Sequence, residues 1–195
     1  GIITIIFGFL FLLSLISYSP DDPNFIFSKG EDIKNFLGFN GSLISDFFFQ
    51  SIGLISFLIP ITIIITGANV LFKKKILLFF ENLFFIVLYS LVGSIYLSLF
   101  YKDSFFLSVS GNGGFIGNFL AESFIKEIVI INKDISYYFL ITFIIILFLQ
   151  SINFKFNYLI SFKNFLFKRN TKKEKSLEQK QIYESNLIQS ETEVQ

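Results

Sequence analysis

The chain has 195 residues, of which 53% are hydrophobic and 30 are phenylalanine, and its formal net charge is +1. This composition, with a mean hydropathy of +0.66, excludes an ordinary soluble globular domain and indicates an all-α membrane protein. The absence of cysteine excludes disulfides and thiolate metal sites, and the absence of histidine removes the commonest general base and zinc ligand.

Four continuous apolar runs predict four transmembrane helices, because they lack the alternation that strands of a membrane barrel show. The predicted spans cover residues 1–17, 47–72, 76–100 and 136–152. The first has about 15 apolar residues where about 20 are needed, so we expect the chain to be a fragment whose true start lies upstream. The second is longer than the bilayer requires, and we expect a bend at Pro60 near its middle.

The positions of the basic residues predict the orientation of these spans. Lys73, Lys74 and Lys75 fill the turn between the second and third spans, and five Lys and Arg residues lie between 168 and 175. Basic residues that flank spans favour the cytoplasm. We therefore expect both termini inside, with two outer loops at residues 18–46 and 101–135.

Two segments outside the spans have patterns of their own. Apolar residues recur at helical spacing between positions 115 and 129, which predicts an amphipathic helix in the second outer loop. A fifth span is the alternative, but Glu122, Lys126 and Glu127 in its centre disfavour it. Residues 1–153 thus form the transmembrane domain, and 154–195 form a juxtamembrane segment followed by a disordered cytoplasmic linker.

Asp21 and Asp22 lie between Pro20 and Pro23, directly after the first span. Adjacent carboxylates rarely converge on one substrate, so general acid and base chemistry is disfavoured. The prolines indicate a rigid helix end whose charges stay in water. The alternative is an epitope for a partner protein.

Two further acidic residues lie near spans. Asp46 precedes the second span and is positioned as its N-cap. Glu81 lies inside the third span, where an ionisable residue is by default a functional candidate. Because the lysine cluster is near, snorkelling or ion pairing is the alternative to transport chemistry.

Small residues predict where helices approach each other closely. Ser90, Ser94 and Ser98 recur every four residues of the third span with Gly93 beside them, and Gly53 and Gly67 lie on the second. These faces could form a subunit interface or pack within the chain. The glycine cluster at 110–117 has no phosphate-loop register, so we interpret it as a turn that leads into the amphipathic helix.

Three stretches together resemble one family. They are SYSPDDPNF at 17–25, NFLGFNGSLISDFFFQSIGLISFLIP at 35–60 and GGFIGNFL at 113–120. In order and spacing they resemble the N-terminal four-helix membrane domain of FtsK/SpoIIIE-type bacterial DNA translocases. The positions that carry the resemblance are Ser17, Tyr18, Ser19, Pro20, Asp22, Pro23, Asn35, Gly38, Gly41, Pro60, Gly113, Gly114 and Gly117.

This resemblance implies a non-catalytic anchor and assembly module of a hexameric, ATP-driven DNA pump at the division septum of the bacterial inner membrane. It also implies cell-division proteins as partners, with ATP, Mg and DNA bound only by a separate C-terminal motor. No G-x-x-x-x-G-K-[ST] motif occurs in the 195 residues, so we expect no enzymatic activity, cofactor or metal here. The alternative function is a small transporter or channel subunit that uses Glu81 and the serine-lined face of the third span.

Overall fold

The structure, a computed structural model, describes residues 1–23, 33–74, 76–103, 107 and 109–154. It divides the chain into the units Gly1–Asn153 and Phe154–Gln195. The described helices all belong to the first unit. The predicted cytoplasmic linker and Lys75 lie outside the described residues.

Within the described ranges the chain forms helices and their connections, without a strand. Two elements depart from α geometry: η1 is a 3₁₀ helix, and η2 is a π-helical segment. The elements in chain order are α1 (Ile2–Ile16), α2 (Gly38–Ile52), η1 (Gly53–Phe57), α3 (Leu58–Lys73), α4 (Leu77–Phe100), α5 (Gly114–Leu120), η2 (Ala121–Ile125), α6 (Lys126–Ile131) and α7 (Lys133–Ser151).

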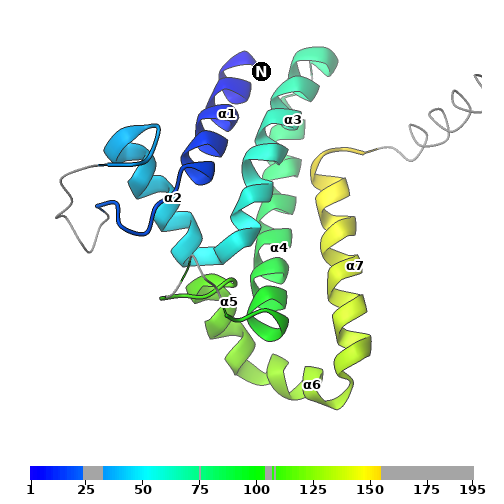
Figure 1. Cartoon of the computed structure of the whole chain (residues 1–195). Coiled ribbons are helices and arrows are strands. Elements are labelled where there is room, and N and C mark those ends of the chain that lie inside the picture. Colours follow the sequence, from blue (N-terminus) through cyan, green and yellow to red (C-terminus); the bar gives the residue numbers. More distant parts are fainter. Residues whose placement is uncertain (24–32, 75, 104–106, 108, 155–195) are drawn as a thin grey trace, which may run out of the picture. The chain divides into compact units, whose positions relative to one another are not determined.

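Helices α1, α3, α4 and α7 lie side by side in the first unit (Figure 1). Helix α1 packs on α3, α3 packs on α4, and α4 packs on α7. The beginning of α1 and the ends of α3 and α7 lie together, and we name this the lysine end because Lys73 and Lys74 lie there. Helices α5 and α6 lie at the opposite side, and the connection between α1 and α2 lies at the side of the bundle beside the beginning of α2 (Figure 1); we name the region from this connection to α6 the loop end.

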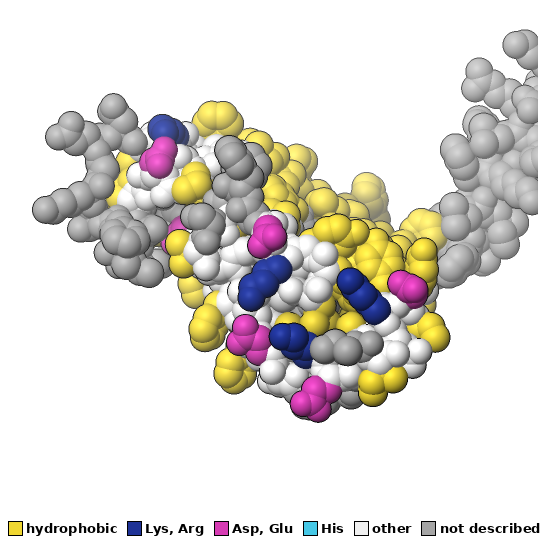
Figure 2. Space-filling model, turned by 60° about the horizontal axis from the view of Figure 1, so that its bottom comes forward, with side chains coloured by type: hydrophobic (Ala, Val, Ile, Leu, Met, Phe, Trp, Pro, Cys, Tyr) yellow, Lys and Arg dark blue, Asp and Glu magenta, His cyan; other side chains and the backbone are white. Residues whose placement is uncertain are grey.

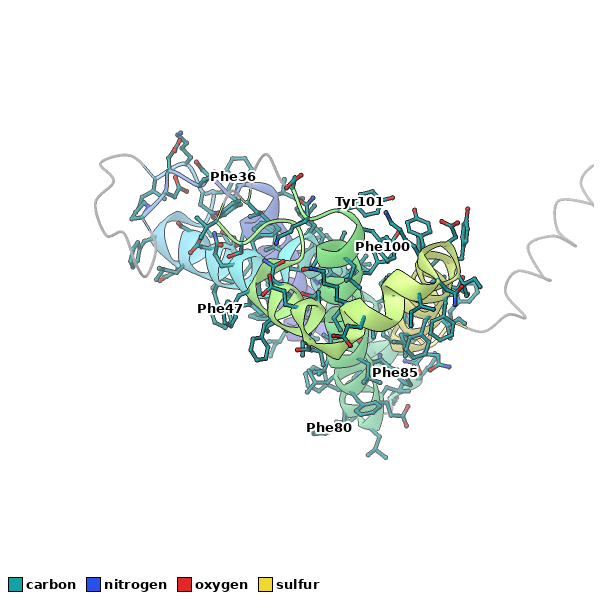
Figure 3. All side chains as sticks on the ribbon, turned by 90° about the horizontal axis from the view of Figure 1, so that it is seen from below. Phe36, Phe47, Phe80, Phe85, Phe100 and Tyr101 are labelled. Atoms are coloured by element: carbon teal, nitrogen blue, oxygen red, sulfur yellow. The ribbon has the colours of Figure 1, made fainter. Side chains whose placement is uncertain are left out.

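Three helical stretches are long and apolar enough to cross a membrane: Gly38–Lys73, Leu77–Phe100 and Lys133–Ser151. Helix α1 is apolar but shorter, at 15 residues. Large hydrophobic side chains face outward from the bundle, as Phe36, Phe47 and Phe80 do (Figure 3). Such a surface fits hydrocarbon rather than water as the surrounding solvent.

The second predicted span differs from the expectation in its start and its bend. Helical structure begins at Gly38, nine positions before Phe47, and the helix breaks at Gly53 rather than at Pro60. Gly53 has φ +71° and ψ −150°, a conformation that only glycine adopts without strain. Pro60 lies in the first turn of α3, where its missing N–H removes no hydrogen bond.

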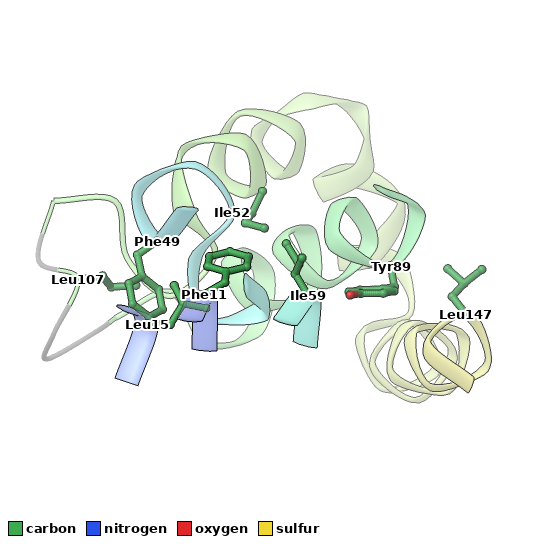
Figure 4. Packing of buried hydrophobic residues seen from close by; sticks show 8 residues of the cluster. All are labelled: Phe11, Leu15, Phe49, Ile52, Ile59, Tyr89, Leu107 and Leu147. Atoms are coloured by element: carbon green, nitrogen blue, oxygen red, sulfur yellow. The ribbon is translucent and has the colours of Figure 1, made fainter. Parts of the chain in front are cut away.

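The buried apolar residues extend from α1 through α3 and α4 to α7 (Figure 4). Tyr89 of α4 is fully buried and lies between Ile59 of α3 and Leu147 of α7. In lipid this packing stabilises mainly through dispersion and close fit, because lipid tails are as apolar as the core. Glycines permit the closest approach: a methyl group at Gly67 of α3 would meet Ile5 of α1, as the small-residue pattern predicted.

The predicted amphipathic helix of the second outer loop is three helical pieces rather than one. The break lies at Ser123, whose ψ of −166° is not helical. Phe115 and Phe119 of α5 stack with ring centroids 6.3 Å apart and remain 68% and 65% exposed. An exposed aromatic pair beside charged residues fits the headgroup boundary of a bilayer.

Candidate functional site

Buried polar residues form two groups in the bundle. Most members of the group at the loop end belong to the family-like stretches, and we name this group the loop-end network. The group at the lysine end joins α3, α4 and the end of α7, and we name it the lysine-end cluster. The members of the loop-end network are Ser14, Ser17, Tyr18, Asp22, Pro23, Asn35, Gly41, Ser42, Ser45, Asp46, Gln50 and Ser110.

Asp22 is the buried acid of this network, with only 3% of its surface exposed. Its two carboxylate oxygens accept hydrogen bonds from the backbone N–H groups of Lys34 and Asn35, each at 2.9 Å. The prediction that both acids stay in water is therefore wrong for Asp22. It was made because neighbouring acids at a helix end usually face solvent, but backbone donors from the far side of the loop satisfy this one.

Asp21 has the opposite environment. Its carboxylate is exposed and lies 2.9 Å from Nζ of Lys34. The hydrogen bond and the negative charge of Asp21 raise the pKa of Lys34. Because both groups are in water, this pair adds little to stability.

Asn35 connects the first loop to α1 and α2. Its Nδ2 donates to the carbonyl of Ser14 at 2.8 Å, and its Oδ1 accepts from the N–H of Leu37 at 3.1 Å. The backbone carbonyl of Asn35 accepts from the N–H of Gly38 at 2.9 Å and so starts α2. A methyl group at Gly41 would overlap Oδ1 of Asn35, which explains why glycine stands there.

Three serine hydroxyls complete these connections. Ser17 donates to the carbonyl of Leu13 and accepts from the N–H of Phe36 at 3.1 Å. Ser14 donates to the carbonyl of Gly41 at 2.7 Å, and Ser42 donates to the carbonyl of Pro23 at 2.8 Å. The stretch at 17–25 and the stretch at 35–60 thus form one structure, although residues 24–32 between them are outside the described part.

Asp46 is not the N-cap of a span, because it lies in the middle of α2. The expectation placed the helix start too late, and the helix begins at Gly38 after Leu37. The carboxylate of Asp46 accepts from the hydroxyl of Tyr18 at 3.2 Å and from Nε2 of Gln50 at 3.3 Å. Burial, followed by the charge of Asp46, raises the pKa of Tyr18 to about 12.

The connection between α4 and α5 joins this network through Gln50. The hydroxyl of Ser110 donates to Oε1 of Gln50 at 2.6 Å, and Nδ2 of Asn118 on α5 donates to the carbonyl of Ser110 at 2.7 Å. A continuous series of hydrogen bonds therefore runs from Tyr18 through Asp46 to α5. It couples the position of the connection between α1 and α2 to that of the connection between α4 and α5.

Glycines bring the second loop against α4 and the break after α2. Methyl groups at Gly114 and Gly53 would each overlap the backbone of the other segment, and the N–H of Leu54 donates to the carbonyl of Asn112 at 2.9 Å. A methyl group at Gly117 would overlap the backbone of Ser94. This loop is consequently a tightly packed connection.

The serine-lined face of α4 therefore packs within the chain. The hydroxyl of Ser94 donates to the carbonyl of Gly113, and a methyl group at Gly113 would overlap the side chain of Ser98. On the neighbouring face, a methyl group at Gly93 would overlap Ile55 of η1. The sequence left a subunit interface and packing within the chain as alternatives for these small residues. The structure favours packing within the chain for Ser94, Ser98 and Gly93.

The lysine-end cluster has two parts, and the first is centred on Thr62 of α3. Its hydroxyl lies 3.1 Å from the hydroxyl of Tyr89 on α4 and 3.2 Å from that of Ser151 on α7. Ser151 also donates to the carbonyl of Phe148. All three hydroxyls are buried, so the three helices share one set of hydrogen bonds.

The second part is centred on Asn82 of α4, which is 1% exposed. Its Nδ2 donates to the hydroxyl of Thr66 at 2.7 Å, and its Oδ1 accepts from Nδ2 of Asn153. Nearby, Nδ2 of Asn69 donates to the carbonyl of Ile152 at 3.2 Å. These bonds fix the point at which the chain leaves α7.

Sequence reasoning singled out Glu81 but missed Asn82 beside it. Glu81 is exposed and makes no ion pair or hydrogen bond with any residue that the structure describes. The overlooked signal was the recurrence of Thr, Asn and Tyr inside apolar helices, where each polar side chain needs a partner. Asn82, rather than Glu81, is thus the residue through which this part of α4 makes a polar contact with α3.

Charged side chains gather over the loop end (Figure 2). They include Lys102 and Glu122, whose nearest charged atoms are 3.9 Å apart and exposed. Among the described residues no group of three acids, histidines or cysteines could hold a metal ion. Both polar groups serve to position helices, and neither presents a nucleophile and base to a shared cavity.

Comparison with known proteins gives a consistent result. The family described as the 4TM region of DNA translocase FtsK/SpoIIIE matches residues 1–162. The chain is similar to "DNA translocase FtsK" of Rickettsia typhi, with 30% identity over 178 residues, and of Rickettsia prowazekii, with 33% over 173 residues. These matches cover 84% and 85% of the chain but only 23% and 22% of the relatives. A protein of the same name from Caulobacter vibrioides is 37% identical over 69 residues, or 35% of the chain and 8% of that relative. No solved structure was found to match.

Proposed function

The chain belongs to the family of 4TM regions of the DNA translocase FtsK/SpoIIIE, and from that premise we propose that it is the membrane anchor and assembly module of a septal DNA translocase. The family-like residues build a network that positions loops, with no feature of a catalytic site. The observation that carries the proposal is the lysine-end cluster, because it fixes the end of α7 to α3 and α4. A motor that pulls on a linker after α7 would exert its force at the end of this helix.

The proposed topology has four spans with both termini in the cytoplasm. The beginning of α1 and the end of α7 lie at the same end of the first unit, as an even number of spans requires. Lys73 and Lys74 lie at this end, and basic residues beside spans favour the cytoplasm. The apolar α1 is the fourth span in this arrangement.

The proposed partners follow from the same premise. We expect the chain to assemble as a hexamer in the inner membrane, and the outer loops to be recognised by division proteins at the septum. The loop-end network supports this role because it holds the two outer loops in one fixed arrangement. ATP, Mg and DNA would be bound only by a motor beyond this region.

The transporter alternative has less support. It requires Glu81 and the serine face of α4 to line a common path, but Glu81 is exposed and Ser94 and Ser98 pack on the second outer loop. Replacing Glu81 with Gln should therefore leave the anchor function unchanged. A transporter that depends on this carboxylate would lose its flux.

The simplest test is to read the gene in the same frame past Gln195. The proposal expects a long polar linker followed by G-x-x-x-x-G-K-[ST], the phosphate-binding motif of an ATP-driven motor. A fluorescent fusion of the complete protein should then gather at the division site. A stop codon directly after Gln195, or an even distribution of the fusion around the cell, would count against the anchor function.

A further inference from the structure

A large apolar groove opens on the outside of the bundle between α1 and α4. Its volume is about 660 Å³, within the range of ligand sites. Both α1 and α4 pack on α3, so α3 lies at the bottom of the groove and the other two form its sides. The residues that represent these three surfaces are Ile59 and Ile63 of α3, Phe7 and Leu10 of α1, and Leu83 and Ile86 of α4.

Basic residues lie beyond the end of the groove that points toward the lysine end. Its α3 residues, Ile59, Ile63 and Thr66, follow the spacing of one helix face, and the same spacing continued leads to Lys73. Lys73 and Lys74 are exposed, and neither forms an ion pair with any residue that the structure describes. Lys73 therefore continues the α3 face of the groove about two helical turns beyond Thr66, and Lys74 follows it at the end of α3.

The length of the groove decides what could fill it. On α1 the lining of the groove runs from Ile3 to Ser14, which are 11 residues apart, or about 17 Å at 1.5 Å per residue. The hydrocarbon of one leaflet of a bilayer is about 15 Å deep, whereas a membrane-spanning helix needs about 30 Å. Ile44 and Phe48 of α2 line the groove at the loop end, where a full-length helix would have to continue.

From this match of length, apolar lining and charge, we propose that the groove binds one anionic phospholipid. Its acyl chains lie between α1 and α4, and its phosphate binds Lys73 and Lys74. An apolar groove in a membrane cannot stay empty without losing dispersion contacts, and lysines beside it select a negative headgroup. In the orientation proposed above this lipid belongs to the inner leaflet, and only that assignment rests on the proposed function.

Native mass spectrometry of the full chain in detergent micelles tests the proposal. With phosphatidylglycerol or phosphatidylcholine added, we expect one bound lipid and about a tenfold preference for phosphatidylglycerol. The double variant Lys73→Gln/Lys74→Gln should lose the preference. The matched control, Lys102→Gln/Lys126→Gln at the loop end, should keep it.

Filling the groove tests the acyl-chain site separately. Leu83→Trp should reduce the retention of both lipids, while Phe84→Trp, at an exposed position on the same helix outside the lining, should not.

Equal retention of the two lipids by the unmodified chain, or equal effects of the two lysine variants, would overturn the proposal. So would a second copy of the chain in place of bound lipid. None of these outcomes depends on topology or division partners, so a failure here leaves the proposed anchor function standing.

Discussion

The two polar groups stabilise the bundle in different ways. At the loop end, side chains bond to backbone groups, as Asp22 does with the N–H groups of Lys34 and Asn35. At the lysine end, side chains of regular helices mostly bond to each other, as Asn82 does with Thr66 and Asn153. The difference arises because helices satisfy their own backbone, whereas a loop leaves N–H and C=O groups that need partners.

This comparison predicts unequal sensitivity to mutation. A backbone group that loses its only partner costs more than a helix–helix hydrogen bond, which averages about 0.6 kcal/mol in membranes. Glycines that allow segments to touch should be the least replaceable of all, because a methyl group there meets backbone rather than a flexible side chain. The loop end should therefore be the stringent region.

Gly53→Ala should have the largest effect. Its φ and ψ lie in a region reserved for glycine, and the added methyl group would overlap the carbonyl of Asn112, so we expect a loss of about 3 kcal/mol in unfolding free energy. The matched control is Gly38→Ala, which also has positive φ, +63°, but open space around it and should cost about 1 kcal/mol. Unfolding in detergent, followed by circular dichroism, measures both. Equal losses would show that the overlap with Asn112 contributes nothing.

Asp22→Ala should come next, at about 2 kcal/mol, because it leaves two backbone N–H groups without their acceptor. Asp21→Asn is the control, since its ion pair with Lys34 is exposed and should change stability by less than about 0.5 kcal/mol. The same unfolding assay applies. If Asp21→Asn were the more damaging change, the buried role of Asp22 would be refuted.

Asn82→Ala should cost about 1 kcal/mol at the lysine end, because hydrogen bonds between membrane helices are individually weak. Its neighbour Glu81 provides the control, and Glu81→Gln should have no measurable effect on stability. A loss for Asn82→Ala greater than that for Asp22→Ala would reverse the proposed order of the two regions.

The smallest effect concerns pH. The folded pKa of Tyr18 is raised to about 12 from its usual 10, mainly by burial and then by Asp46. A raised pKa means that the stabilising contribution is fully present below pH 10 and is lost as pH rises through about 12. Tyr18→Phe should remove a component near pH 12 from the tyrosinate absorbance titration of the intact protein. An unchanged titration would contradict the buried position of the Tyr18 hydroxyl.

Prediction from the sequence was better for long helices than for connections. The predicted spans 1–17 and 76–100 match α1 and α4 closely, because continuous apolarity in lipid permits little except helix. Asp46 and Pro60 were assigned wrongly because α2 starts inside a polar stretch and its break depends on a contact between Gly53 and a loop about 60 residues later. No local sequence pattern predicts the contact between Gly53 and this loop.

The family-like stretches indicated the structurally important positions more reliably than local patterns indicated the role of each residue. Asp22, Asn35 and Gly41 belong to the family-like stretches, and the structure brings them together around Ser14. The lysine-end cluster has no such motif. Its members Thr62, Thr66 and Asn82 are single polar residues in three different apolar turns, and only packing shows that Thr62 faces Tyr89 and Thr66 faces Asn82.

The central claim is that the lysine end faces the cytoplasm and the loop end faces outward. The chain contains no cysteine, so one introduced thiol reports one position without background. We propose to label Lys74→Cys and Lys102→Cys in spheroplasts with a membrane-impermeant maleimide, before and after lysis. The account predicts that Lys102→Cys is labelled in intact spheroplasts and that Lys74→Cys is labelled only after lysis. Labelling of Lys74→Cys in intact spheroplasts would contradict it.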